Sequence, residues 1–158
     1  SQMEATLAML KQCAAACPSE HWKGKIANDS FRFVAYHALF YTDLYLSMSE
    51  SAFQLRELHR RGGDERGEAA SPGLSKEETL GYVPIVRQKL LDILGAETEE
   101  SLAGPSGFSW RKTTRAELHV YNIRHAQHHV GQLSAYLRRV EKTLTDPKAL
   151  GWIGQGWR

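Results

Sequence analysis

Three of the seven histidines lie within five residues of one another, at His125, His128 and His129. The apolar residues around them recur at helical spacing, in which each residue is rotated by about 100° from the last. His125 and His129 are therefore only about 40° apart and share the apolar face of the expected helix, while His128 lies at its rim. Because neutral imidazoles bind zinc, nickel, iron and cobalt, this pair forms half of a transition-metal site.

A further histidine, His37, lies in the aromatic and aliphatic segment 31–48. This segment keeps a helical period for about five turns, which favours a helix over a strand. A single histidine in a core is usually structural. Three buried imidazoles without a cation would leave polar nitrogens unsatisfied, which favours a shared metal ion. The expected apolar face surrounds His37 with Phe33, Val34, Phe40, Tyr41, Leu44, Tyr45 and Met48.

Two ligands one turn apart and a third from another helix leave a fourth coordination position open, as in catalytic metal sites. A zinc protease would carry glutamate directly after its first histidine, where this chain has Ala126. Glu117 is expected to project toward the side of the apolar face that carries Arg124, and no catalytic residue is assigned. Four side chains could either support the site or pack structurally: Tyr41, Asn122, Gln132 and Tyr136.

Four helices are expected to carry these residues, over 3–17, 31–48, 75–94 and 113–140. Ser75 and Glu78 form a capping-box pattern at the start of the third, and Gly95 is expected to end it. Pro84 is expected to kink that helix or split off its first turn. The pattern contains no convincing strand and no internal repeat, which predicts a single all-α bundle domain over 1–158.

The connections are more varied than the helices. Segment 19–30 ends in a polar cluster, Asn28-Asp29-Ser30, that offers an N-cap. The connection 49–74 is long and rich in charge and glycine, as lids and disordered segments often are. His59 is expected at the surface because it adjoins this charged run. Trp152 and Trp157 are expected to dock on the body or on a partner subunit.

The composition excludes several classes. Lys+Arg 20 against Asp+Glu 18 gives a formal net charge of only +2, and the basic residues are scattered, so no nucleic-acid partner is expected. No apolar run is long enough for a membrane span and no secretory signal is recognisable, which predicts a cytoplasmic protein without a membrane partner. Cys13 and Cys17 cannot form a disulfide framework and are expected to pack in the core.

The segments Phe-Val-Ala-Tyr-His37-Ala-Leu-Phe-Tyr and Tyr-Asn-Ile-Arg-His125-Ala-Gln-His-His129-Val-Gly-Gln-Leu resemble the DinB-like (DinB/YfiT) superfamily. Ser-Lys-Glu-Glu-Thr-Leu-Gly-Tyr and Gly-Phe-Ser-Trp are similar to its members too. The resemblance implies an up-down-down-up four-helix bundle that forms homodimers. It also implies that His37, His125 and His129 hold a divalent metal and that His128 does not.

The superfamily includes transferases and isomerases that use low-molecular-weight thiols, and many members without an assigned activity. The resemblance therefore implies a metal-dependent enzyme of the thiol S-transferase or isomerase type, with a small-molecule substrate such as a low-molecular-weight thiol. Zinc or nickel is the expected metal, and iron, cobalt and manganese remain open. The alternatives are a non-catalytic, stress-related metal-binding bundle, a small-ligand-binding protein and a metal-dependent hydrolase.

Overall fold

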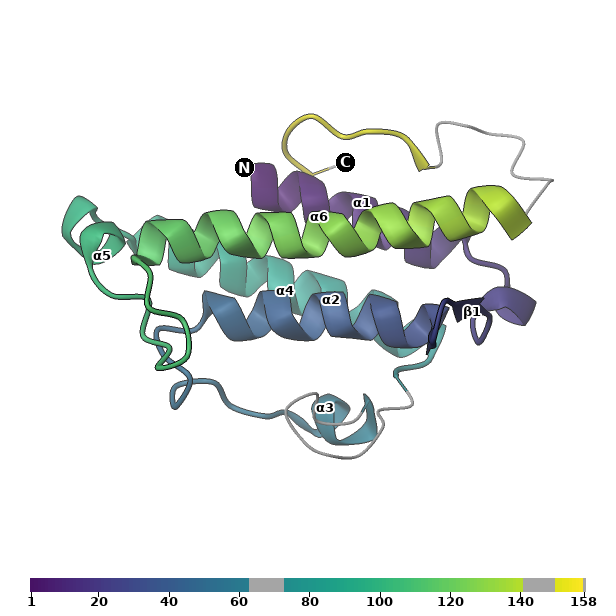
Figure 1. Cartoon of the computed structure of the whole chain (residues 1–158), viewed down its shortest axis with the longest axis horizontal. Helices are drawn as coiled ribbons and strands as arrows, with labels where there is room; N and C mark the ends of the chain where they lie inside the picture. The colour runs from purple at the N-terminus through teal and green to yellow at the C-terminus, as the bar shows by residue number, and fades with distance from the viewer. Residues whose placement is uncertain (63–72, 141–149, 158) are drawn as a thin grey trace.

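Four long helices dominate the computed structural model, which describes residues 1–62, 73–140 and 150–157 (Figure 1). The all-α class is thereby confirmed. The long helices are α1 (Gln2–Ala16), α2 (Phe31–Leu46), α4 (Lys76–Ala96) and α6 (Arg115–Val140). The connections contain η1 (Ser19–His21), α3 (Glu57–Gly62), α5 (Glu99–Ala103) and an antiparallel pair of two-residue strands, β1 (Lys25–Ile26) and β2 (Asp29–Ser30).

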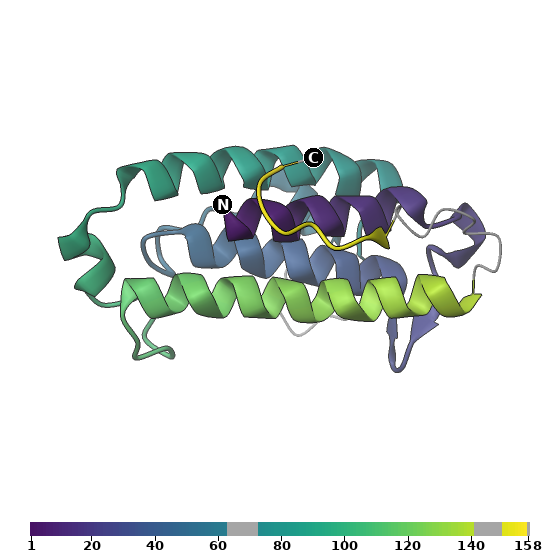
Figure 2. The same ribbon diagram turned by 90° about the horizontal axis from the view of Figure 1, so that it is seen from above.

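Each long helix packs against two others. α6 and α4 both contact α1 and α2, so α6 and α4 occupy opposite corners of the bundle. Figures 1 and 2 show that α1 and α6 run in one direction and that α2 and α4 run in the other. α2 and α6 are therefore antiparallel neighbours, and His37 of α2 faces the segment of α6 that carries His125 and His129. No helix in the described ranges has the length and apolar character needed to cross a membrane.

Local capping signals define where the long helices begin. The Ser75 hydroxyl accepts a hydrogen bond from the Glu78 backbone N–H, and the Glu78 carboxylate accepts one from the Ser75 N–H, as the capping-box pattern predicts. Ser30, from the predicted cluster, caps α2 by accepting from the Phe33 N–H. These bonds satisfy backbone donors that the first helical turn leaves free, so the sequence locates these N-termini well.

Two helix ends differ from the prediction. α4 continues past Gly95 to Ala96, and it is not split at Pro84. Pro84 is exposed, so water can bind the carbonyl that loses its helical partner there. α2 ends at Leu46, and Met48, predicted on its apolar face, is 55% exposed instead.

Arg115 holds the C-terminal end of α2. Its side chain is almost fully buried, and its guanidinium donates to three backbone carbonyls and to the Glu97 carboxylate. The last carbonyls of a helix have no partner within the helix, so Arg115 satisfies groups that burial would otherwise leave unpaired. The accepting carbonyls belong to Tyr45 at 3.1 Å, Leu46 at 3.0 Å and Ser47 at 2.7 Å. This clamp fixes the position of Tyr45, which borders the site described below.

The surface position predicted for His59 is wrong, because its side chain is fully buried. The Arg56 backbone N–H donates to His59 Nδ1 at 3.0 Å, so the ring proton is assigned to Nε2, which lies 2.8 Å from the Tyr82 hydroxyl. The Phe40 and Phe53 rings pack on the imidazole. The charged residues next to His59 in the sequence therefore do not indicate the exposure of its side chain.

Asp43 is the centre of a buried polar network beside His59. Its carboxylate is fully buried and accepts hydrogen bonds from Lys89 Nζ at 2.6 Å, Arg56 Nη1 at 2.7 Å and the Tyr82 hydroxyl at 2.7 Å. Burial lowers the pKa of Lys89 and raises the pKa of Tyr82 well above its usual range. The network joins α2 and α4 to the connection between them.

The C-terminal segment packs on the helical bundle. This is one of the two predicted alternatives, the other being a partner subunit. Gln2 Nε2 donates to the Gly154 carbonyl, and the Trp157 ring lies beneath the cations of Lys11 and Arg87. Trp152 is 73% exposed and does not follow the prediction. The charged run over 63–68 and the Asp146-Pro147 breaker lie outside the described residues.

Candidate metal centre

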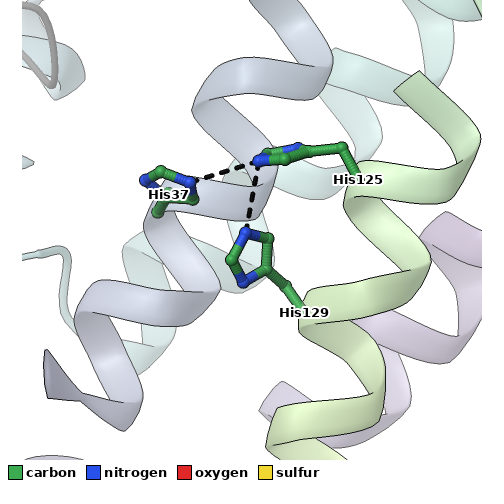
Figure 3. Close-up of side chains that lie close together, drawn as sticks. All are labelled: His37, His125 and His129. Atoms are coloured by element: carbon green, nitrogen blue, oxygen red, sulfur yellow. Dashed lines mark hydrogen bonds between the residues drawn. The ribbon is translucent and has the colours of Figure 1, made fainter. Parts of the chain in front are cut away.

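His37, His125 and His129 converge between α2 and α6 (Figure 3). His125 Nε2 lies 3.2 Å from His37 Nε2 and 3.2 Å from His129 Nε2. One ligand atom from each ring lies within 4.8 Å of the others. Nitrogens bound tetrahedrally to one ion, with bonds of about 2.0 to 2.1 Å, are separated by about 3.3 Å. The two distances from His125 are close to that value, and all three ligand atoms lie within 4.8 Å of one another, so a movement of the rings would bring them to a common ion.

Gln132 orients one of these rings. His129 Nδ1 lies 2.8 Å from Gln132 Oε1, and an amide oxygen can only accept, so the ring proton is assigned to Nδ1. The lone pair on His129 Nε2 is then directed at His125. Metal-ligating histidines commonly donate their second nitrogen in this way.

The contacts among the rings are difficult to satisfy with protons alone. His125 Nε2 approaches two other Nε2 atoms but can carry only one proton, which cannot form a good hydrogen bond to both. A cation can accept a lone pair from each of the three nitrogens at once. The donor set therefore suits a divalent transition metal in general, without selecting one element.

Burial keeps two of the rings in the neutral form. It lowers the pKa of His125 to about 3, assisted by the neighbouring histidines, and it lowers the pKa of His129 to about 4. The Gln132 contact partly opposes the shift at His129. Metal ligation requires neutral imidazole, so protons compete little at these two positions near neutral pH.

These shifts predict an acid-labile metal-free protein. The ordinary pKa of 6.5 lies above the folded values of about 3 and 4, so the unfolded chain binds more protons between them. With chelator present, the urea midpoint should fall as the pH drops from about 6.5 toward 4, and above 6.5 these groups should have no effect. His125→Gln should show a smaller fall than the unsubstituted protein. Equal falls in both would contradict the assignment.

A cavity of about 450 Å³ adjoins His37 and His125. Four aromatic side chains form most of its wall, and Leu44 and Glu50 complete it; the aromatic residues are Tyr41, Tyr45, Trp110 and Tyr121. Its volume lies within the usual range for small-molecule sites. A larger hollow of about 700 Å³ over 103–117 contacts none of the three histidines, so the smaller cavity is the one placed for metal chemistry.

Of the four side chains that could support the site or pack structurally, two contact the clustered histidines and two do not. The ring centroids of Tyr41 and His37 are 4.7 Å apart, and the Gln132 side-chain oxygen accepts a hydrogen bond from His129 Nδ1. Asn122 is buried and donates to the Thr42 carbonyl, and Tyr136 packs on Phe31. These last two have structural contacts instead.

Glu117, His128 and the two cysteines lie outside the site. Glu117 accepts hydrogen bonds from Thr114 at the start of α6 and does not line the cavity. His128 is exposed, and Cys13 and Cys17 are buried in the hydrophobic core. Burial raises the pKa of each thiol to about 12, which suits the packing role expected for both cysteines.

Glu50 and Trp110 border the cavity although no pattern in the sequence predicts it. Both residues lie in connections, where no periodicity indicates a face. The structure joins them through a hydrogen bond from Trp110 Nε1 to Glu50 Oε2 at 3.0 Å. No local sequence pattern predicts the contact between Glu50 and Trp110, because it depends on how two distant loops pack together.

Comparison with known protein families gives an independent result. A family model described as the DinB superfamily matches residues 2–133, a range that includes all three clustered histidines. No curated protein and no solved structure matches the chain. The family match covers most of the sequence and agrees with the helical architecture. The chain therefore belongs to the DinB superfamily.

Proposed function

We propose that this protein is a metal-dependent enzyme of the thiol S-transferase or isomerase type, in which His37, His125 and His129 hold a divalent ion, zinc or nickel. One observation carries the proposal: three convergent imidazoles border a cavity large enough for a small substrate. A set of three protein ligands leaves a coordination position for an exogenous group, which distinguishes catalytic from structural sites.

The chemistry of the lining favours a substrate that brings its own nucleophile. A divalent ion bound here would favour the thiolate form of a small thiol at neutral pH. Tyr41 and Tyr45 offer aromatic surface to the rest of such a molecule. Burial raises the pKa of Tyr45 well above its usual range, and its contact with Tyr121 adds to the shift, so this hydroxyl stays protonated.

Cobalt substitution provides the test. The cobalt-loaded protein is titrated with glutathione, bacillithiol and mycothiol while thiolate-to-metal absorbance is recorded. We expect a new absorbance band that saturates at about one thiol per ion, because one coordination position is open. The protein's own cysteines should not contribute, since burial raises both of their pKa values to about 12.

A matched variant assigns the signal to the site. His129→Ala should lose the band, and His128→Ala, which changes an exposed neighbour outside the cluster, should keep it. If no thiol produces a band in loaded protein, the thiol function is wrong. A bundle that binds metal without turnover would then be the better description.

A further inference from the structure

The cavity beside the histidines has a continuous aromatic wall. Tyr45 joins its members, with ring centroids 5.6 Å from Tyr41, 5.8 Å from Trp110 and 5.4 Å from Tyr121. Aromatic faces carry partial negative charge and attract cations. The wall therefore accepts a flat or apolar body and tolerates a positive charge next to it.

Glu50 adds a full negative charge to this wall. Its Oε2 accepts from Trp110 Nε1, and its backbone N–H donates to the Gly107 carbonyl at 3.4 Å. Both bonds join the turn after α2 to the loop before α6, so the carboxylate is held in place at the cavity. Its other oxygen, Oε1, accepts no hydrogen bond from the described residues and is available to a ligand.

Arg111 is a nearby cation whose charge opposes that of Glu50. Its guanidinium lies 3.6 Å from the Tyr121 ring centroid and 5.7 Å from the Trp110 ring centroid, but it is not among the residues that line this cavity. It borders the larger hollow over 103–117 instead. Because Coulomb interactions weaken with distance, a ligand group inside the cavity and in contact with Glu50 is affected more by the carboxylate.

We infer that this cavity selects a thiol whose other end carries a positively charged amine, and that Glu50 determines this specificity. The inference rests on the proposed thiol function, since it assumes that the sulfur binds the ion that the three histidines would hold. The substrate class is therefore an aminothiol with a flat or apolar body. The amine is placed against Glu50 and the aromatic wall.

Three arylthiols of similar size test the inference: 4-(aminomethyl)benzenethiol, 4-(hydroxymethyl)benzenethiol and 4-mercaptophenylacetic acid. Each is titrated into cobalt-loaded protein, and its affinity is taken from the thiolate-to-metal band. The neutral alcohol reports thiol binding without the charge. We expect the amine to bind roughly tenfold more tightly than the acid, as expected for a cation beside aromatic faces and a carboxylate.

Two variants assign the preference to one side chain. Glu50→Gln should reduce the amine-to-acid ratio of affinities to about one to two, because the charge is lost and the shape is kept. Glu100→Gln removes an exposed carboxylate on α5 that does not line the cavity, so the ratio should remain near tenfold.

The outcomes distinguish the thiol function from the amine preference. If the neutral alcohol gives no band, thiol coordination fails and the aminothiol inference fails with it. If the alcohol binds but the amine and the acid bind equally, or the acid binds more tightly, the inference is overturned and the thiol function remains. If the amine preference survives in Glu50→Gln, Glu50 is not the determinant.

Discussion

Replacing His129 with alanine is expected to lower the bound metal from about one ion per chain to well below that value. His129 Nε2 lies 3.2 Å from His125 Nε2, so its loss leaves two imidazoles in place of three. The melting temperature of the metal-loaded protein should also fall, because an ion that binds the folded state stabilises it. Elemental analysis of untreated protein and a thermal melt measure both effects.

His128→Ala is the matched control for this substitution. It removes an adjacent histidine from the same helix, but His128 is exposed and lies outside the cluster. Its metal content should equal that of the unsubstituted protein. Unchanged metal content in His129→Ala would remove His129 from the ligand set, and equal loss in both variants would indicate a general effect on the fold.

Asp43→Asn is expected to destabilise the protein by about 2 to 3 kcal/mol. The change keeps the shape of the side chain but leaves Lys89 and Arg56 without their carboxylate. Asp43 is fully buried, whereas the Lys89 and Arg56 side chains are 22% and 38% exposed, so solvent limits the loss. Urea unfolding measures this effect, which is a large share of the stability of an ordinary domain.

Two further variants show where that loss originates. Asp92→Asn removes an exposed carboxylate of α4 and should change the stability little. Adding Lys89→Met to Asp43→Asn removes one stranded cation and should recover part of the loss. If Asp43→Asn unfolds at the same urea concentration as Asp92→Asn, the network contributes nothing to stability.

Much of the secondary structure could be predicted from the sequence. The Ser75 capping box and the Ser30 cap involve residues three apart, so their geometry is decided within one helical turn. Helix C-termini were less well predicted. α2 ends at Leu46 where Arg115, far away in sequence, binds the last carbonyls, and no local pattern encodes that contact.

His59 shows why neighbours in sequence can mislead. The charged run beside it predicts exposure, but the ring packs inside the protein against Phe40 and Tyr82. Asp43 and Lys89 lie on α2 and α4, and nothing local indicates that they share one network with Arg56.

A homodimer and a cytoplasmic location stay predictions.

The sequence by itself determined that His125 and His129 share one face, because helix geometry fixes residues four apart. Only the tertiary structure decided that His37 meets them, since this depends on how α2 and α6 pack. It also decided that Glu50 and Trp110 border the same cavity. Loops have no periodicity to reveal their inner side, so their contribution to the site follows from long-range packing alone.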